Sequence, residues 1–178
     1  MRIATKKLTI MAALTAAALI VFIIEAQIPL PLPIPGAKLG LANAITLFAL
    51  FYSQSGQQGT VSFKNSDVLI ILICRILLGS FITGRFALLI LSLSGGLLSI
   101  AVQIFMKRIV TDKQIWVCGA IGAVFHNIGQ IVAAILISGT PAIAAYLPAL
   151  IIIGIISGTI TGLIAQAALS RMKSIYTN

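Results

Sequence analysis

Polar side chains able to take part in chemistry stand inside long apolar runs of this sequence. They are Glu25, Arg75, His126, Asn127 and Gln130. Ionisable and strongly polar groups are costly to bury in such surroundings, so they often mark a functional site. His126 and Gln130 are four residues apart and share a helix face with Gly122,. We expect this face to line a cavity while Asn127 faces a neighbouring helix.

Each of these residues also has a purely structural interpretation. Arg75 and Glu25 can form a buried ion pair that fixes the order of the helices. A lone histidine in a helix is usually a hydrogen-bonded core residue. His126 has no carboxylate or thiol neighbour in the sequence, which makes it a poor metal ligand. We therefore expect no metal site and no cofactor.

A proline-punctuated segment leads into the second apolar run. It reads PLPLPIPGAKLGLANAITLFAL from Pro29 to Leu50, and its four alternating prolines fix φ and exclude helix. Gly36 then allows a turn, and Lys38 precedes the polar helix positions Asn43 and Thr46. A stiff loop that holds a cation above polar helix positions predicts one wall of a binding site. The alternative is an ordinary connector between two spans.

Six apolar blocks must position these residues. Of 178 residues, 60% are hydrophobic and 8% are charged, and no soluble domain of this length can hide so much apolar surface. A spanning helix needs roughly 20 mostly apolar residues. The blocks are Leu8–Ile28, Leu39–Ser53, Asp67–Thr83, Phe86–Met106, Ile115–Ser138 and Ala144–Ser170. We predict an all-α membrane protein with six transmembrane helices in a single domain over residues 1–178.

The placement of the basic residues predicts the topology. With six spans both termini lie on one side, and that side holds nine of the twelve lysines and arginines. The positive-inside rule then places both termini in the cytoplasm, which fits a multi-pass protein of a bacterial cytoplasmic membrane. Membrane topology explains the excess of basic over acidic residues, so no nucleic-acid partner is expected.

The outer half of the protein is expected to be net positive. Lys38, Arg75 and Arg85 face a single acid there, Glu25. This favours an amphipathic anion as ligand, with its carboxylate or phosphate near the arginines and its apolar body among the helices. A zwitterion or an aromatic heterocycle also fits. Arg85 has a second interpretation as an interfacial anchor whose charge reaches the headgroups.

Small residues recur at helical spacing in the first and last blocks. Close approach of another helix is predicted along Ala12, Ala13, Ala16 and Ala17, and along Gly154, Gly158 and Gly162,. The alanine face suits either packing within the chain or a partner subunit, whereas the glycine stripe predicts tight packing between helices. Cys74 and Cys118 are expected to be small packing residues rather than a disulfide.

The sequence lacks the catalytic residues that several classes of enzyme require. The sequence has three acidic residues, Glu25, Asp67 and Asp112, whereas a prenyl diphosphate synthase needs clustered aspartates to hold Mg²⁺ against diphosphate. There is no phosphate-binding lysine loop for ATP hydrolysis, and no nucleophile beside a base. We expect a binder or carrier with no catalytic residue.

Two segments resemble a known family. IPGAKLGLANAITLFAL at Ile34–Leu50 and GAIGAVFHNIGQ at Gly119–Gln130 resemble the Gx transporter family, also named heptaprenyl diphosphate synthase component I. That family is similar to the S-components of energy-coupling factor (ECF) importers. The resemblance implies a six-helix bundle with an outward-facing pocket, a first-helix alanine face that meets a transmembrane coupling subunit, and two separate ATPase subunits. It also implies uptake of a vitamin-type or precursor compound.

Two hypotheses follow for the function. The first is a substrate-binding transport subunit in which a small ligand meets Lys38, Asn43, Arg75, His126, Asn127 and Gln130, with Glu25 and Arg85 at the same site. The ligand is a vitamin, quinone-precursor or isoprenoid-precursor type of compound. The second is a non-transporting membrane partner of a prenyl diphosphate synthase or of a quinone-linked electron-transfer system. Its docking surfaces are MKRIVTDK near Lys107 and RMKSIYTN near Lys173.

Overall fold

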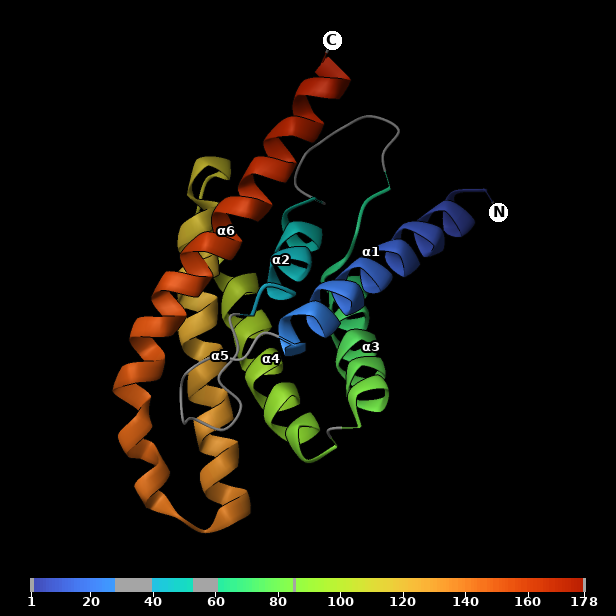
Figure 1. The fold of residues 1–178 in the computed structure, drawn as a ribbon. Helices are drawn as coiled ribbons and strands as arrows, with labels where there is room; N and C mark the ends of the chain where they lie inside the picture. The colour runs from blue at the N-terminus through green and yellow to red at the C-terminus, as the bar shows by residue number, and fades with distance from the viewer. Residues whose placement is uncertain (1, 28–39, 53–60, 85, 178) are drawn as a thin grey trace.

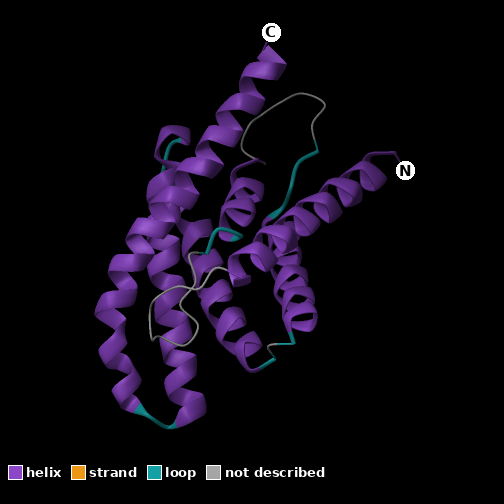
Figure 2. Cartoon of the chain, in the orientation of Figure 1, coloured by secondary structure: helices purple, strands orange, loops and turns teal. Residues whose placement is uncertain are grey.

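A computed structural model describes residues 2–27, 40–52, 61–84 and 86–177. Six α-helices account for most of this part of the chain, which contains no strand (Figure 2). They are α1 (Arg2–Gln27), α2 (Asn43–Tyr52), α3 (Asn65–Thr83), α4 (Ala87–Met106), α5 (Ile115–Ser138) and α6 (Leu147–Thr177). Two short 3₁₀ turns, η1 (Asp112–Gln114) and η2 (Pro141–Tyr146), precede α5 and α6. The all-α prediction is confirmed.

Five of the helices are long and apolar enough to cross a membrane: α1, α3, α4, α5 and α6. Many of their large apolar side chains are exposed, among them Phe81 at 69% and Leu136 at 78%. Water would penalise such a surface and lipid would not. The chain is therefore a multi-pass membrane protein.

The second predicted span is wrong in length. Helix α2 has ten residues and is about 15 Å long, half the thickness of the hydrocarbon core. Gly40 has a φ of 71°, a left-handed conformation that a helix does not continue through. The N–H of Asn43 instead closes a turn onto the Gly40 carbonyl at 2.8 Å, so the helix starts only at Asn43.

The two ends of the bundle differ in which connections they carry. Figure 1 shows both chain termini at one end, with the α3–α4 and α5–α6 connections at the other. We call the first the terminal face and the second the loop face. On the loop face Gly84 and Gly139 end α3 and α5 with φ of 66° and 65°. That both termini face the cytoplasm stays a prediction.

Helix α2 forms the centre of the core. Leu47, Leu50 and Phe51 of α2 are each 1% exposed, and they pack with Val68 and Ile71 of α3. A helix that is apolar on all sides is expected to be enclosed, and α2 lies among α1, α3 and α6 (Figure 1).

Glycines hold α4, α5 and α6 close together. A Cβ placed on Gly158 would lie 2.5 Å from the Gly119 carbonyl oxygen, and one on Gly129 would lie 2.9 Å from the Gly95 Cα. Only a missing side chain allows such an approach. The predicted tight packing of the Gly154–Gly162 stripe is confirmed, and α4–α6 form one closely packed half of the protein.

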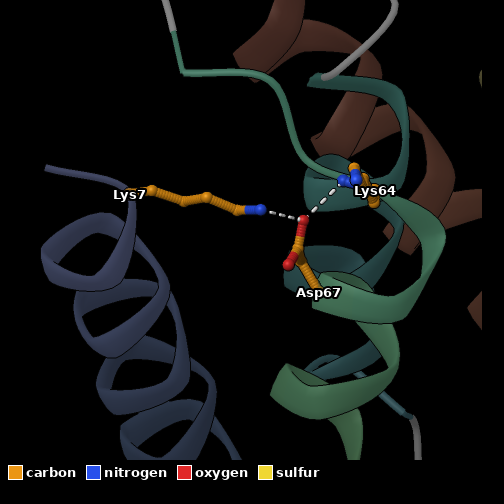
Figure 3. A network of polar contacts seen from close by, with 3 residues as sticks. All are labelled: Lys7, Lys64 and Asp67. Atoms are coloured by element: carbon orange, nitrogen blue, oxygen red, sulfur yellow. Dashed lines mark hydrogen bonds and ion pairs between the residues drawn. The ribbon is translucent and has the colours of Figure 1, made fainter. Parts of the chain in front are cut away.

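Helices α1 and α3 are joined near the terminal face by a polar contact network. Lys7 Nζ lies 2.6 Å from Asp67 Oδ2, which also accepts the backbone N–H of Lys64 at 2.5 Å (Figure 3). Asp67 thereby satisfies an unpaired N–H at the start of α3. Further along the same pair of helices, the Phe22 ring packs on Gly79. These contacts couple α1 to α3 at two levels.

Candidate functional site

A polar cavity lies inside the bundle and is lined by residues of all six helices. Its walls carry both charges and neutral hydrogen-bonding groups, although the helices that form it are apolar. The polar side chains are Glu25, Asn43, Arg75, Ser92, Ser99, Gln103, His126, Asn127, Gln130, Ser157 and Thr161. The two charged groups come from α1 and α3, and the neutral groups of α4–α6 face them.

Arg75 is the central cation of this cavity. It lies near the middle of α3 and is only 5% exposed. Its Nη2 donates to Asn43 Oδ1 at 2.9 Å, while its buried Nε has no hydrogen-bond partner among the described residues. A buried guanidinium with an unused donor is costly unless it meets a polar group. The Arg75 side chain is the only cation among the described residues that line the cavity.

Glu25 does not pair directly with Arg75. The structure gives no ion pair between them within the described residues; instead Glu25 Oε1 accepts the backbone N–H of Gly40 at 2.5 Å. Glu25 is 6% exposed. The carboxylate thus ties the end of α1 to the turn before α2. The predicted ion pair is wrong in its contacts, although both charges line the same cavity.

Helix α5 supplies a polar stripe to the wall of the same cavity. His126 and Gln130 line the cavity, as their spacing predicted, and Gly122 lets the Gln103 side chain of α4 come close. Asn127 has two functions: it lines the cavity, and its Nδ2 donates to the Leu150 carbonyl of α6 at 2.6 Å. The Asn127 side chain therefore joins α5 to α6 by a hydrogen bond in the cavity wall.

The cavity gathers six of the eight residues that the sequence singled out for ligand binding. They are Glu25, Asn43, Arg75, His126, Asn127 and Gln130. Lys38 and Arg85, with the proline-rich loop, lie outside the described residues. That these side chains bind a ligand stays a prediction.

Sequence reasoning missed the polar residues on α4 and α6. Ser99 and Gln103 are four residues apart on α4, and Ser157 and Thr161 are four residues apart on α6. The sequence analysis singled out neither these hydroxyls nor the Gln103 amide as cavity groups. The available signal was polar spacing at i,i+4 within an apolar helix, the same signal that singled out His126 and Gln130.

The cavity is narrow in this conformation. Its volume is about 50 Å³, room for roughly three to five water molecules. Apolar side chains, including Phe22, Leu47 and Ile76, close the remaining wall. Pockets that hold drug-sized organic ligands are several times larger.

The alanine face of α1 is largely uncovered. Ala12, Ala13 and Ala16 are exposed and Ala17 is half-buried, whereas Ala18 is 0% exposed. The first three alanines therefore do not pack against other described helices. They offer a shallow surface to lipid or to another helix.

Fold and cavity together define a multi-pass helical membrane protein with a polar chamber enclosed by its helices. The family model described as heptaprenyl diphosphate synthase component I matches residues 14–168, and the chain belongs to that family. The resemblance to the Gx transporter family is thereby confirmed. No curated protein and no solved structure matches the chain.

Proposed function

We propose that this protein is the ligand-binding subunit of a membrane importer, similar in role to the S-components of ECF transporters. One observation carries the proposal. Polar groups from all six helices line one cavity, and one of them, the buried Arg75, has an Nε with no hydrogen-bond partner among the described residues. A protein that only anchors another has no need of so costly an arrangement inside the bilayer.

An anionic group on the ligand explains the surroundings of Arg75 best. The Arg75 guanidinium lines the cavity, and a charge-assisted bond from it to a carboxylate or phosphate is among the strongest that a side chain makes. The first turn of α2 also lines the cavity through Asn43. The positive end of its helix dipole favours a negative charge there.

The rest of the ligand is proposed to be amphipathic. Phe22, Leu47 and Ile76 provide apolar contacts. The stripe of His126 and Gln130 on α5 offers hydrogen bonds to a ring or chain substituent. A vitamin-like compound or a quinone or isoprenoid precursor combines these features. The family description, which mentions heptaprenyl diphosphate, favours the precursors.

Transport would require movement of one half of the bundle against the other. Glycine contacts and the hydrogen bond of Asn127 make α4–α6 a closely packed unit. Helices α1 and α3 are joined by an ion pair and by a ring packed on a glycine. Separation of the two units would open the cavity. A coupling subunit docked on Ala12, Ala13 and Ala16 is placed to drive it, energised by two ATPase subunits.

The test is to recover the ligand with the protein. The tagged chain is purified in mild detergent, and small molecules extracted from it are identified by mass spectrometry. We expect an anionic amphipathic compound in near-stoichiometric amount, reduced at least tenfold by Arg75→Gln and unchanged by Arg108→Gln, an exposed arginine outside the cavity. The proposal fails if the wild type retains no such compound while Arg75→Gln merely lowers the thermal stability.

A second candidate function rests on the family description. Component I of a synthase implies a membrane subunit that accompanies an enzyme, and the basic terminal face near Lys107 and Arg108 would then dock it. Burial lowers the pKa of Lys107, because its ammonium group is partly shielded from water. Charge reversal of both residues separates the two functions. Loss of a co-purifying prenyl synthase supports docking, whereas recovery of ATPases with the wild type supports transport.

A further inference from the structure

A second, larger cavity lies on the terminal face, between the start of α5 and the last turns of α6. Its volume is about 500 Å³, and Figure 1 shows the start of α5 beside the α6 helix at this end. Its floor is apolar, formed by Ile115, Leu163, Ala167 and Leu169, and its rim carries Lys113, Lys173 and Asp112. It shares no lining residue with the polar cavity around Arg75.

The rim lies at the depth of lipid headgroups. Helix α5 has 24 residues from Ile115 to Ser138, which gives a length of roughly 36 Å. The hydrocarbon core of a bilayer is about 30 Å thick. With Ser138 at the opposite interface, Lys113 lies just beyond the hydrocarbon, where phosphates are found.

The rim is net positive and has donors available. Lys113 is exposed, and Lys173 pairs with Asp112 across the rim. This pair is solvent-exposed, with side chains 36% and 56% accessible, so it is weak and exchangeable. Gln166 also lines the cavity, and its side-chain amide nitrogen is a further donor.

The floor continues into the lipid-facing side of α6. Leu163 is 48% exposed, and Ile160, Ile156 and Ile152 follow toward the loop face at 48%, 58% and 61%. In a membrane this ridge contacts acyl chains. A ligand with a charged head and a long apolar tail can therefore occupy the rim and the ridge together, whereas a small soluble anion uses only the rim.

We propose that this cavity binds an anionic phospholipid, with its phosphate at Lys113 and Lys173 and an acyl chain along Leu163 and Ala167. Basic pockets between helices at the membrane surface suit such headgroups. This site is independent of the proposed transport function. It would hold a lipid whether the protein transports a ligand or anchors an enzyme.

Lipid binding is measured on the full chain purified in detergent, by native mass spectrometry with phosphatidylglycerol or phosphatidylcholine added. We expect phosphatidylglycerol to bind at least tenfold more tightly than phosphatidylcholine. The variant Lys113→Gln/Lys173→Gln should abolish this preference. Ala167→Trp fills the floor without changing charge and should weaken phosphatidylglycerol binding at least fivefold. The control Lys6→Gln/Lys64→Gln removes two positive charges away from the cavity and should leave binding unchanged.

Three results would overturn the proposal. Equal binding of the two lipids would exclude a headgroup site. An equal loss in the Lys6→Gln/Lys64→Gln control would assign the preference to general attraction by the basic face. Displacement of phosphatidylglycerol by millimolar inorganic phosphate, with no effect of Ala167→Trp, would make the rim a site for a soluble anion.

Discussion

Arg75 Nη2 donates a 2.9 Å hydrogen bond to Asn43 Oδ1, which ties the middle of α3 to the first residue of α2. The bond fixes where the half-length helix starts within the bundle. The guanidinium Nε has no hydrogen-bond partner among the described residues, and the Arg75 side chain lines the cavity. The same residue pair thus contributes to the fold and shapes the candidate site.

Substitutions of Asn43 separate these two contributions. Asn43→Ala removes the described partner of a buried guanidinium, so we expect a loss of about 1–3 kcal/mol in stability. Asn43→Asp keeps an acceptor and adds a countercharge, so it should restore the melting temperature while abolishing retention of an anionic compound. Melting and extracted compounds are measured on both variants. If Asn43→Asp retains as much of the anion as the wild type, Arg75 is not its binding group.

Replacing the carboxylate of Glu25 should strengthen the binding of an anion to the cavity. Glu25→Gln preserves the acceptor for the Gly40 N–H but removes the negative charge from the cavity. We expect anion affinity to rise severalfold, because one opposing charge is lost. The measurement is titration of the compound identified with the wild type. Weaker binding in Glu25→Gln would show that the carboxylate itself contacts the ligand.

The contact between α5 and α6 should tolerate no added side chain. A Cβ on Gly158 would lie 2.5 Å from the Gly119 carbonyl oxygen and 2.7 Å from the Ala123 Cβ. Gly158→Ala should therefore cost about 1–3 kcal/mol through overpacking, seen as a lower melting temperature. Ala168→Val, on the exposed side of the same helix, is the matched control and should have little effect. Equal melting of the two variants would contradict the close packing.

The two sides of α1 should respond differently to a larger residue. Ala18 is 0% exposed, so Ala18→Leu should destabilise the fold by about 1–3 kcal/mol. Ala16 is exposed, and Ala16→Leu should leave melting unchanged. If α1 docks a coupling subunit, Ala16→Leu should also reduce its recovery in co-purification. A stable Ala16→Leu variant with full recovery of that subunit would exclude this face as the docking surface.

The link between α1 and α3 should depend on charge only weakly. Asp67→Asn removes the charge opposite Lys7 but keeps an acceptor for the Lys64 N–H, whereas Asp67→Ala removes both. We expect losses of up to about 1 kcal/mol for Asn and about 0.5–2 kcal/mol more for Ala. A double-mutant cycle with Lys7→Gln isolates the ion pair. A coupling that does not fall as salt is raised would contradict a pair that is partly accessible to solvent,.

The all-α class, the bounds of α5 and the close packing of the glycine stripe could be predicted because they depend on local sequence. Continuous apolar runs determine where the hydrocarbon is crossed, and the bounds of α5 were predicted at Ile115 and Ser138. The Gly154–Gly162 spacing likewise determined a close approach, since a missing side chain has the same effect in any neighbourhood. Polar residues such as His126 and Gln130 stood out against these apolar runs.

The tertiary structure alone decided which groups meet. Helices that are apolar on every side carry almost no periodic signal for their inward face, because lipid and protein core are both apolar. Sequence therefore did not show that Gln103 and Thr161 face the cavity. It also did not show that α2 begins within the bundle, or that Glu25 binds Gly40 instead of Arg75. These pairings depend on the depth and rotation of each helix, which packing against its neighbours sets.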